Sequence, residues 1–503
     1  MKPEQAYEEL IRLSHQETVL ASANDLLEWD EEVVMPPKGM KHRAEQMALI
    51  AGITHDRATD PRYEELLSTV EASSLVSESE SPAAVNVREL RRGYDKECRI
   101  PRRLVEESAR VTALASRAWE QARKKNDYKS AAPWLDKVFT MAREEADASG
   151  HNGNRYDALL DDYEPGMTSD QLTALFAQLR DGVIPLIEAH RDKAGLPSRA
   201  LRTKRFPVDL QRSFAEDIAK AVGFDFDAGC LDIGRNPFCT QIGPGDVRVV
   251  LCFYTNDLLR GIFTLLHELG HAFYDGGLDA ANYGTPMGES ASAAFHESQS
   301  RLWENFVGRS AGFWRYFYPR LRNTFDRGLR DVSLETFMEI INRVEPGVIR
   351  VEADEVTYNI HVLIRVELER ALLSGDLVAA DLPGAWSELY LRYLGVTPTD
   401  DRSGCLQDSH WAEGLIGYFP TYALGNVYSA QIFEAAGRDL GTLDDAFGQG
   451  DFDGFREWLR ENIHRHGMRY RSGEIIKRIT GRTSDPSGLI RSLSRRYELR
   501  PSV

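Results

Sequence analysis

The pentapeptide His267-Glu268-Leu269-Gly270-His271 is the feature of this chain that most constrains its fold. Positions i and i+4 of an α-helix share a face, so both imidazoles can reach one metal ion while Glu268 lies beside them. The apolar stretch at residues 261–269 is typical of a buried helix, and buried imidazoles need a metal or a hydrogen-bonding partner. The sequence therefore predicts a buried helix with the metal-binding geometry of a zinc hydrolase.

A hydrolytic zinc site needs three protein ligands and one open position for water. Residues 276–288 contain four glycines and Pro286, which predict a loop, and residues 289–306 return to helical composition. Glu297 lies on this second helix, and we expect it to be the third ligand. The alternative for Glu297 is a surface ion pair with Arg301, four residues further on. Glu268 is the predicted general base.

Three motifs carry a resemblance to a known family. The run from His296 to Asn305, which reads His-Glu-Ser-Gln-Ser-Arg-Leu-Trp-Glu-Asn, resembles the M32 metallocarboxypeptidases, the thermostable carboxypeptidase Taq family. Residues 349–354 and 404–411 are similar to the family's Ile-Arg-x-x-Ala-Asp and Gly-x-x-Gln-Asp-x-His-Trp motifs. The resemblance spans nearly the whole chain. Asn236 and Val250 depart from it, because the family usually has His and Thr there, and these changes leave substrate preference open.

The resemblance also guides the expected recognition of substrate. A guanidinium matches a carboxylate bidentately, and Arg350, in the Ile-Arg-x-x-Ala-Asp motif, is the expected clamp for a free peptide C-terminus, with Arg248 second. The alternative for Arg350 is an ion pair with a nearby acidic side chain, Glu352 or Asp354. His410 and Tyr422 are candidate hydrogen-bond donors to the developing oxyanion. For His410 a hydrogen-bonded core position is the competing interpretation.

The family implies a zinc-dependent carboxypeptidase of broad specificity that acts on peptides with a free C-terminus and forms a homodimer. Two alternatives stay open. One is a zinc oligopeptidase or endopeptidase of the neurolysin type, and the other is a degenerate, non-catalytic member that serves as a scaffold. Co²⁺ accepts the same ligands as Zn²⁺, so the native metal is also open.

Composition excludes several other classes. A net charge of -17 argues against nucleic acid or an anionic membrane as a partner. The first residues lack the apolar core of a signal peptide and no apolar run is long enough to span a membrane, so we expect a cytoplasmic protein. The five cysteines are scattered without Cys-x-x-Cys spacing, which predicts neither disulfides nor a thiolate zinc site.

Hydrophobic periodicity predicts a mainly α-helical fold with a small β-sheet beside the zinc helix. The family resemblance implies the same architecture with a deep active-site cleft. We expect a single peptidase domain over residues 1–503, in which 1–200 form a mostly helical part covering the cleft and 201–503 carry the zinc site. Residues 246–254 are expected to form an edge strand along which a peptide can lie. The predicted helices are residues 4–27, 43–53, 103–124, 131–148, 169–190, 210–221 and 355–373; the other predicted strand is 348–351, with weaker candidates around Phe206 and at 226–233.

Overall fold

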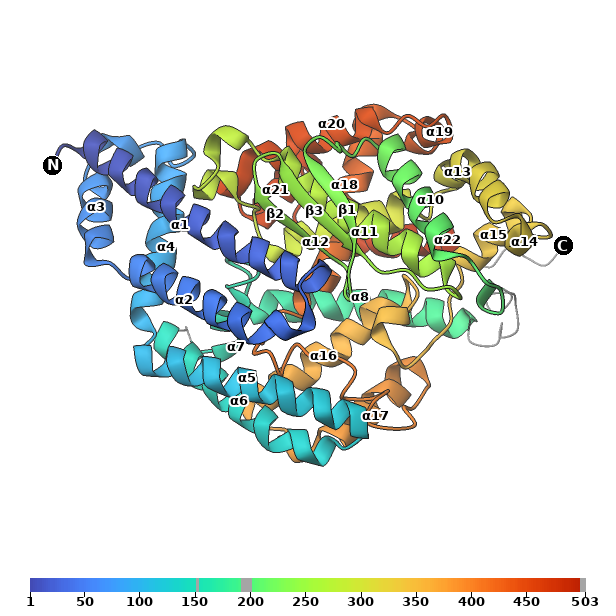
Figure 1. Cartoon of the computed structure of the whole chain (residues 1–503), viewed down its shortest axis with the longest axis horizontal. Helices are drawn as coiled ribbons and strands as arrows, with labels where there is room; N and C mark the ends of the chain where they lie inside the picture. Colours follow the sequence, from blue (N-terminus) through green and yellow to red (C-terminus); the bar gives the residue numbers. More distant parts are fainter. Residues whose placement is uncertain (151–152, 191–200, 498–503) are drawn as a thin grey trace. The chain divides into compact units, whose positions relative to one another are not determined.

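The computed structural model describes residues 1–150, 153–190 and 201–497 (Figure 1). The chain folds into two compact units, each assembled from three separate segments. The first unit comprises Met1–Cys98, Pro197–Ile341 and Gln431–Thr483, and the second comprises Arg99–Leu196, Asn342–Ala430 and Ser484–Val503. The boundary that we expected near residue 200 lies outside the described residues. The single domain and the deep cleft stay predictions.

The first unit holds the N-terminal helices, the only sheet found in the described residues, and the helix with the His pair. Helix α1 packs against α2 and α3, and its apolar residues Ala6 and Leu10 are buried with Leu66, Leu67 and Val70. The helices of this unit are α1 (Pro3–Val33), α2 (Met40–Ala58), α3 (Pro61–Glu71), α4 (Pro82–Arg99), α10 (Val208–Ala221), α11 (Leu258–Gly277), α12 (Ala293–Arg301), α13 (Ala311–Thr324), α14 (Asp326–Leu329), α15 (Leu334–Ile341), α19 (Leu443–Gly448), α20 (Asp453–Asn462) and α21 (Ser472–Thr480).

The described residues of the second unit form helices and connecting loops, with no strand among them. Its central helix, α16, is buried along most of its length and packs against α6, α8 and α17. Its helices are α5 (Arg102–Lys125), α6 (Tyr128–Ser149), α7 (Arg155–Leu160), α8 (Ser169–His190), α16 (Thr357–Ser374), α17 (Leu382–Leu394) and α22 (Ser487–Tyr497), and α18 (Pro420–Leu440) begins in this unit and ends in the first. The mainly α-helical class predicted from the sequence is confirmed.

The sheet of the first unit has three strands in the order β1-β3-β2, which are Gly229–Ile233, Asp246–Leu251 and Phe238–Gly243. Strand β1 runs parallel to β3 and β2 runs antiparallel to it. The expectation that residues 246–254 form an edge strand is therefore wrong, because β3 is paired on both sides. The strand also ends at Leu251, after which the chain turns into α11.

Two other strand predictions are wrong. Residues 348–351 form no strand, and the chain makes a 3₁₀ turn at Arg350–Glu352. The side chain of Gln407 takes the backbone groups that a strand partner would use, since its Oε1 accepts from Arg350 N–H at 2.8 Å and its Nε2 donates to Val348 O at 3.0 Å. Phe206 lies in an extended segment whose N–H donates to Thr255 O at 2.7 Å, without a ladder.

The predicted helices are all present, and α8 has the predicted bounds. The weak strand candidate at residues 226–233 is confirmed for Gly229–Ile233. All five cysteines are free, as expected. In the described part of the chain, no helix combines the length and the apolarity needed to cross a membrane.

Candidate functional site

Helix α11 positions the His pair, and α12 brings a carboxylate to it. Asp257 caps α11 by accepting from Arg260 N–H, and Ser292 caps α12 by accepting from Phe295 N–H. The two helices approach closely at Gly270, the fourth residue of the pentapeptide. A Cβ atom there would lie 2.4 Å from Gln299 O and 2.5 Å from Ser300 Cα, both on α12. Glycine at this position therefore allows the backbones of the two helices to touch.

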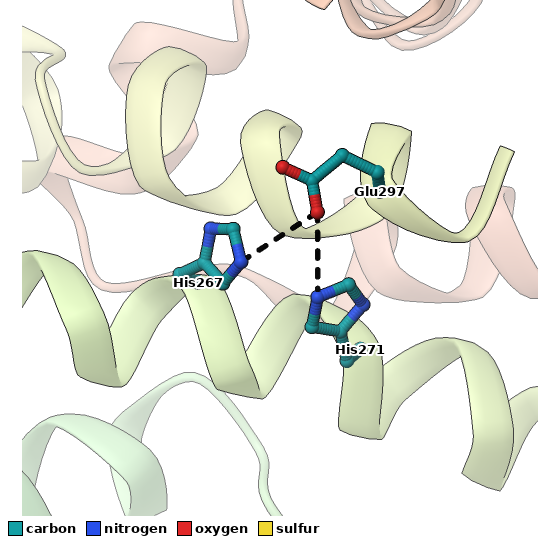
Figure 2. A group of neighbouring side chains, drawn as sticks. All are labelled: His267, His271 and Glu297. Atoms are coloured by element: carbon teal, nitrogen blue, oxygen red, sulfur yellow. Dashed lines mark ion pairs between the residues drawn. The ribbon is translucent and has the colours of Figure 1, made fainter. Parts of the chain in front are cut away.

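The close approach places Glu297 directly over the two imidazoles (Figure 2). Its Oε2 lies 3.7 Å from Nε2 of His267 and 3.7 Å from Nε2 of His271, and the three ligand atoms lie within 4.8 Å of one another. Ligands of a tetrahedral ion with bonds of about 2.0–2.1 Å are separated by about 3.4 Å. The three predicted ligands are therefore brought together with a spacing and donor set that fit a zinc ion.

Glu297 is held by its own helix as well. Arg301 Nε donates to Glu297 Oε1 at 2.6 Å, and Ser300 Oγ donates to Glu297 Oε2 at 3.1 Å. The ion pair with Arg301, which we considered as the alternative to metal binding, is thus present together with the ligand geometry. It occupies one carboxylate oxygen and leaves the other directed at the histidines, which favours a monodentate ligand.

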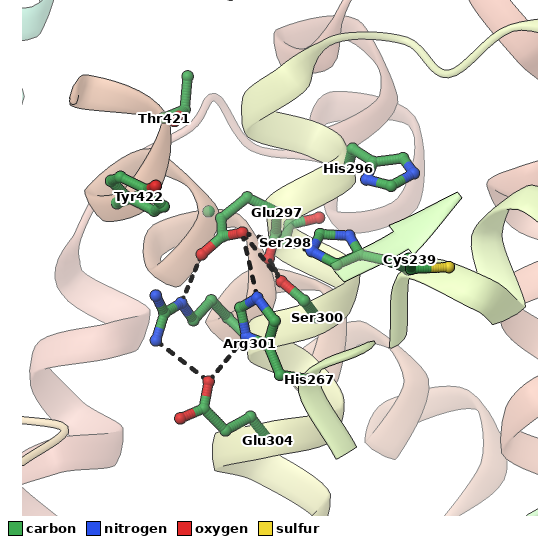
Figure 3. A network of polar contacts seen from close by, with 12 residues as sticks. Cys239, His267, His296, Glu297, Ser298, Ser300, Arg301, Glu304, Thr421 and Tyr422 are labelled. Carbon is green, nitrogen blue, oxygen red and sulfur yellow. Dashed lines mark hydrogen bonds and ion pairs between the residues drawn. The ribbon is translucent and has the colours of Figure 1, made fainter. Parts of the chain in front are cut away.

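Glu304 belongs to a polar network with His267, Arg301 and Glu297 (Figure 3), and this role was not predicted from the sequence. Helix α12 continues as a π-helix over Leu302–Val307, which carries Glu304 back to His267, whose Nδ1 lies 2.9 Å from Glu304 Oε2. Arg301 Nη1 also donates to Glu304 Oε2, at 3.1 Å. A carboxylate on Nδ1 of an imidazole fixes the tautomer in which Nε2 is free to bind a metal. The sequence signal that could have indicated Glu304 is its position seven residues, or about two helical turns, after Glu297.

Burial and charge set the protonation of these groups. Burial raises the pKa of Glu268 to about 7. The pKa of His267 is raised, because Glu297 and Glu304 together outweigh the burial that would lower it. Burial and the adjacent His296 hold the pKa of His271 well below its usual value. Burial would raise the pKa of Glu304, but Arg301 and His267 outweigh it and lower that pKa to about 2.

His296 packs against His271, the second predicted histidine ligand. Its ring stacks on that of His271 with centroids 4.5 Å apart, and its Nε2 lies 2.8 Å from Asp275 Oδ1 on α11. The sequence motif includes His296, but we assigned no role to it. The stacking shows that it packs against a predicted metal ligand.

Arg248 is held by contacts on strand β3 and helix α1. Its Nε and Nη2 each donate to the Asp246 carboxylate at 2.9 Å, and its guanidinium lies 4.2 Å from the centroid of the Trp29 ring. These contacts account for one edge and one face of the guanidinium. Its predicted role as the second clamp for a carboxylate stays a prediction.

The second unit brings together the other three predicted residues, Arg350, His410 and Tyr422. The Arg350 guanidinium lies 4.9 Å from the centroid of the Tyr422 ring, and Tyr422 Oη lies 3.0 Å from His410 Nε2. Burial and then Arg350 lower the pKa of His410 to about 4, so this imidazole is neutral at physiological pH. Arg350 pairs with Asp408 rather than with Glu352 or Asp354, the acidic partners considered from the sequence.

Comparisons with known proteins agree with these motifs. The family model described as carboxypeptidase Taq (M32) metallopeptidase matches residues 9–497. The chain is 46% identical to thermostable carboxypeptidase 1 of Thermus thermophilus, with 99% of each chain covered, and 36% identical to carboxypeptidase 1 of Bacillus subtilis, with 97% and 96% covered. The solved M32 carboxypeptidase from Deinococcus radiodurans R1 superimposes with a TM-score of 0.94 at 37% identity, covering 98% of this chain and 99% of that one.

Proposed function

Because the chain belongs to the carboxypeptidase Taq (M32) family of metallopeptidases, we propose that it is a zinc carboxypeptidase that removes residues one at a time from the C-terminus of peptides. The observation that carries the zinc assignment is the triangle of His267, His271 and Glu297. Two imidazoles and one carboxylate are the ligand set of hydrolytic zinc sites, and they leave a position for water. Co²⁺ fits the same set.

A zinc ion held by these three residues would supply the Lewis acidity that activates water and polarises the scissile carbonyl. The chain supplies the proton transfers. Glu268 follows a ligand directly on α11 and is almost fully buried, so its carboxylate is the base that takes a proton from the attacking water. The same carboxyl group then passes the proton to the leaving amine. Arg301 and Glu304 keep Glu297 and His267 oriented throughout.

Arg350 is the group that we assign to the free C-terminal carboxylate of the peptide. Hydrogen bonds within the described residues use Nε, one N–H of Nη1 and one N–H of Nη2, out of the five N–H groups of a guanidinium. One N–H on Nη1 and one on Nη2 remain to receive the substrate carboxylate. His410 and Tyr422, which contact each other beside Arg350, are the candidate donors to the oxyanion.

Specificity for the terminal side chain is proposed to be broad, as the family resemblance implies. Asn236 and Val250 replace the family's usual His and Thr. Asn236 lies just before β2, and Val250 lies in β3, where it is buried and paired with Phe238. Neither residue is a predicted zinc ligand or the predicted base. We therefore expect them to change substrate preference rather than the reaction.

The test compares an N-terminally blocked peptide carrying a free C-terminus with its amidated twin, using zinc-loaded protein and Glu268→Gln as the inactive control. We expect stepwise shortening of the free acid alone, abolished in the variant, when products are followed by mass spectrometry. Internal cleavage of both peptides would instead identify an endopeptidase of the neurolysin type. Bound zinc without any cleavage would identify a non-catalytic member.

A further inference from the structure

Three charged side chains form a buried row in the second unit, on segments far apart in the sequence. Asp408 lies between two arginines: its Oδ1 accepts from Arg350 Nη2 at 2.8 Å, and its Oδ2 lies 2.7 Å from Arg365 Nη2. Arg365, on α16, is completely buried, and the side chains of Arg350 and Asp408 are exposed by only 7% and 9%. Each oxygen of the Asp408 carboxylate therefore contacts a guanidinium group.

The charges in this row do not balance. Arginine stays protonated in proteins, and the two guanidinium groups hold the pKa of Asp408 far below its usual value despite burial, so the row carries two positive charges and one negative charge. Burial lowers the pKa of both His361 and His410, so these histidines are neutral and leave the charge of the row unchanged. Glu355, a buried carboxylate between Arg350 and Arg365 in sequence, does not offset the charge of the row, because it forms an ion pair with Arg496 at 2.7 Å. An unmatched charge in a buried position is costly, and an added anion relieves that cost.

Arg365 is itself fixed by its surroundings. Its Nη1 donates to His361 O at 2.8 Å and to Tyr390 Oη at 3.0 Å, and its guanidinium lies 4.5 Å from the centroid of the Trp386 ring. Its Nε donates to Asp408 Oδ2 at 2.7 Å. Arg365, which is rigidly held and always charged, therefore fixes one oxygen of Asp408, while the other oxygen of Asp408 binds Arg350.

We propose that Arg365 is a positioning residue for the carboxylate of the peptide substrate: through Asp408 it orients the Arg350 guanidinium, and its charge gives the row the net positive charge that the substrate anion neutralises. This inference rests on the proposed function, in which Arg350 binds the C-terminal carboxylate. A single Arg350–Asp408 pair would be neutral and would attract a further carboxylate less strongly. The second arginine keeps Asp408 in place and restores the excess charge.

The test measures binding rather than turnover, in the zinc-loaded Glu268→Gln background so that peptides are retained. A blocked peptide is titrated as the free acid and as the amide, and the ratio of the amide Kd to the acid Kd isolates the contribution of the carboxylate. We expect Arg365→Met to lower this ratio by about tenfold. A role in folding alone would weaken both peptides equally and leave the ratio unchanged, which would overturn the inference.

Two further variants secure the result. Arg370→Met removes an arginine from the same helix that bonds Thr173 instead, so its ratio should stay at the parent value. Arg365→Lys keeps the charge but loses the planar fork, and we expect a decrease of about threefold, which tests the inference even where Arg365→Met does not fold. Equal affinity for acid and amide in the parent protein would refute the Arg350 clamp itself, whereas a large parent ratio that Arg365 variants preserve would refute only the present inference.

Discussion

Glu304 shows how a single residue outside the ligand set can decide the quality of a metal site. Replacing Glu304 with Gln removes the charged acceptor on His267 Nδ1 and the second partner of Arg301, while keeping the side chain's size. Loss of such an outer carboxylate typically costs 10- to 100-fold in metal affinity. We expect a zinc Kd weakened by about that factor in competition with a chelator. Glu339→Gln, at an exposed position on α15, should retain the parent affinity, and equal affinities of the two variants would contradict the assignment.

The contact between α11 and α12 depends on one glycine and offers a test at the scale of elements. Gly270→Ala would gain helix propensity but would press a methyl group against the α12 backbone at Gln299, and we expect a net loss of about 1–3 kcal/mol in stability together with weaker zinc binding. Gly276→Ala, later on the same helix, meets nothing within 4 Å and is the matched control. Thermal denaturation of the two variants should separate them, and similar midpoints would refute the close contact.

A buried carboxyl group in the core of the second unit predicts how the stability of the protein depends on pH. Glu369 on α16 accepts from Tyr156 Oη, Trp411 Nε1 and Gly417 N–H, yet burial outweighs these bonds and raises its pKa to about 7. The folded state therefore binds this proton more tightly than the unfolded state. Protonated Glu369 therefore stabilises the folded state. This stabilisation is fully present below the unfolded pKa of about 4.5 and is lost as the pH rises through 7.

The stability of the parent protein relative to Glu369→Gln should accordingly fall between pH 5 and pH 8, by at most about 3 kcal/mol. Chemical denaturation of both proteins across this range measures the difference. A difference that is constant or that grows with pH would show that Glu369 is ionised in the folded state at pH 5.

The sequence predicted those features that depend on contacts between residues close together in the chain, and it missed those that depend on distant residues. The grouping of His267, His271 and Glu297 could be predicted because helical spacing and a short loop between two helices determine it. Glu304 was missed because it reaches His267 only through the π-helical continuation of α12. The predicted strand at 348–351 failed because a side chain far away in sequence, that of Gln407, satisfies its backbone.

Strand β2 was not expected, since it is short, mixed in composition and bounded by Pro237 and Gly243, and without it β3 was taken for an edge. At the scale of the molecule, each unit is built from three segments, so no shift in composition along the chain marks a boundary between them. The family resemblance supplied the class of enzyme, which neither periodicity nor charge could indicate. The homodimer implied by that resemblance stays a prediction.

The proposed function requires one hydrolytic zinc ion per chain, held by His267, His271 and Glu297. Its most direct test is to titrate metal-free protein with zinc while following release of the C-terminal residue from a blocked peptide. We expect activity to be absent at the start, to rise linearly and to stop rising at one equivalent of zinc per chain. Full activity without added metal, or a rise that continues to two equivalents, would contradict it.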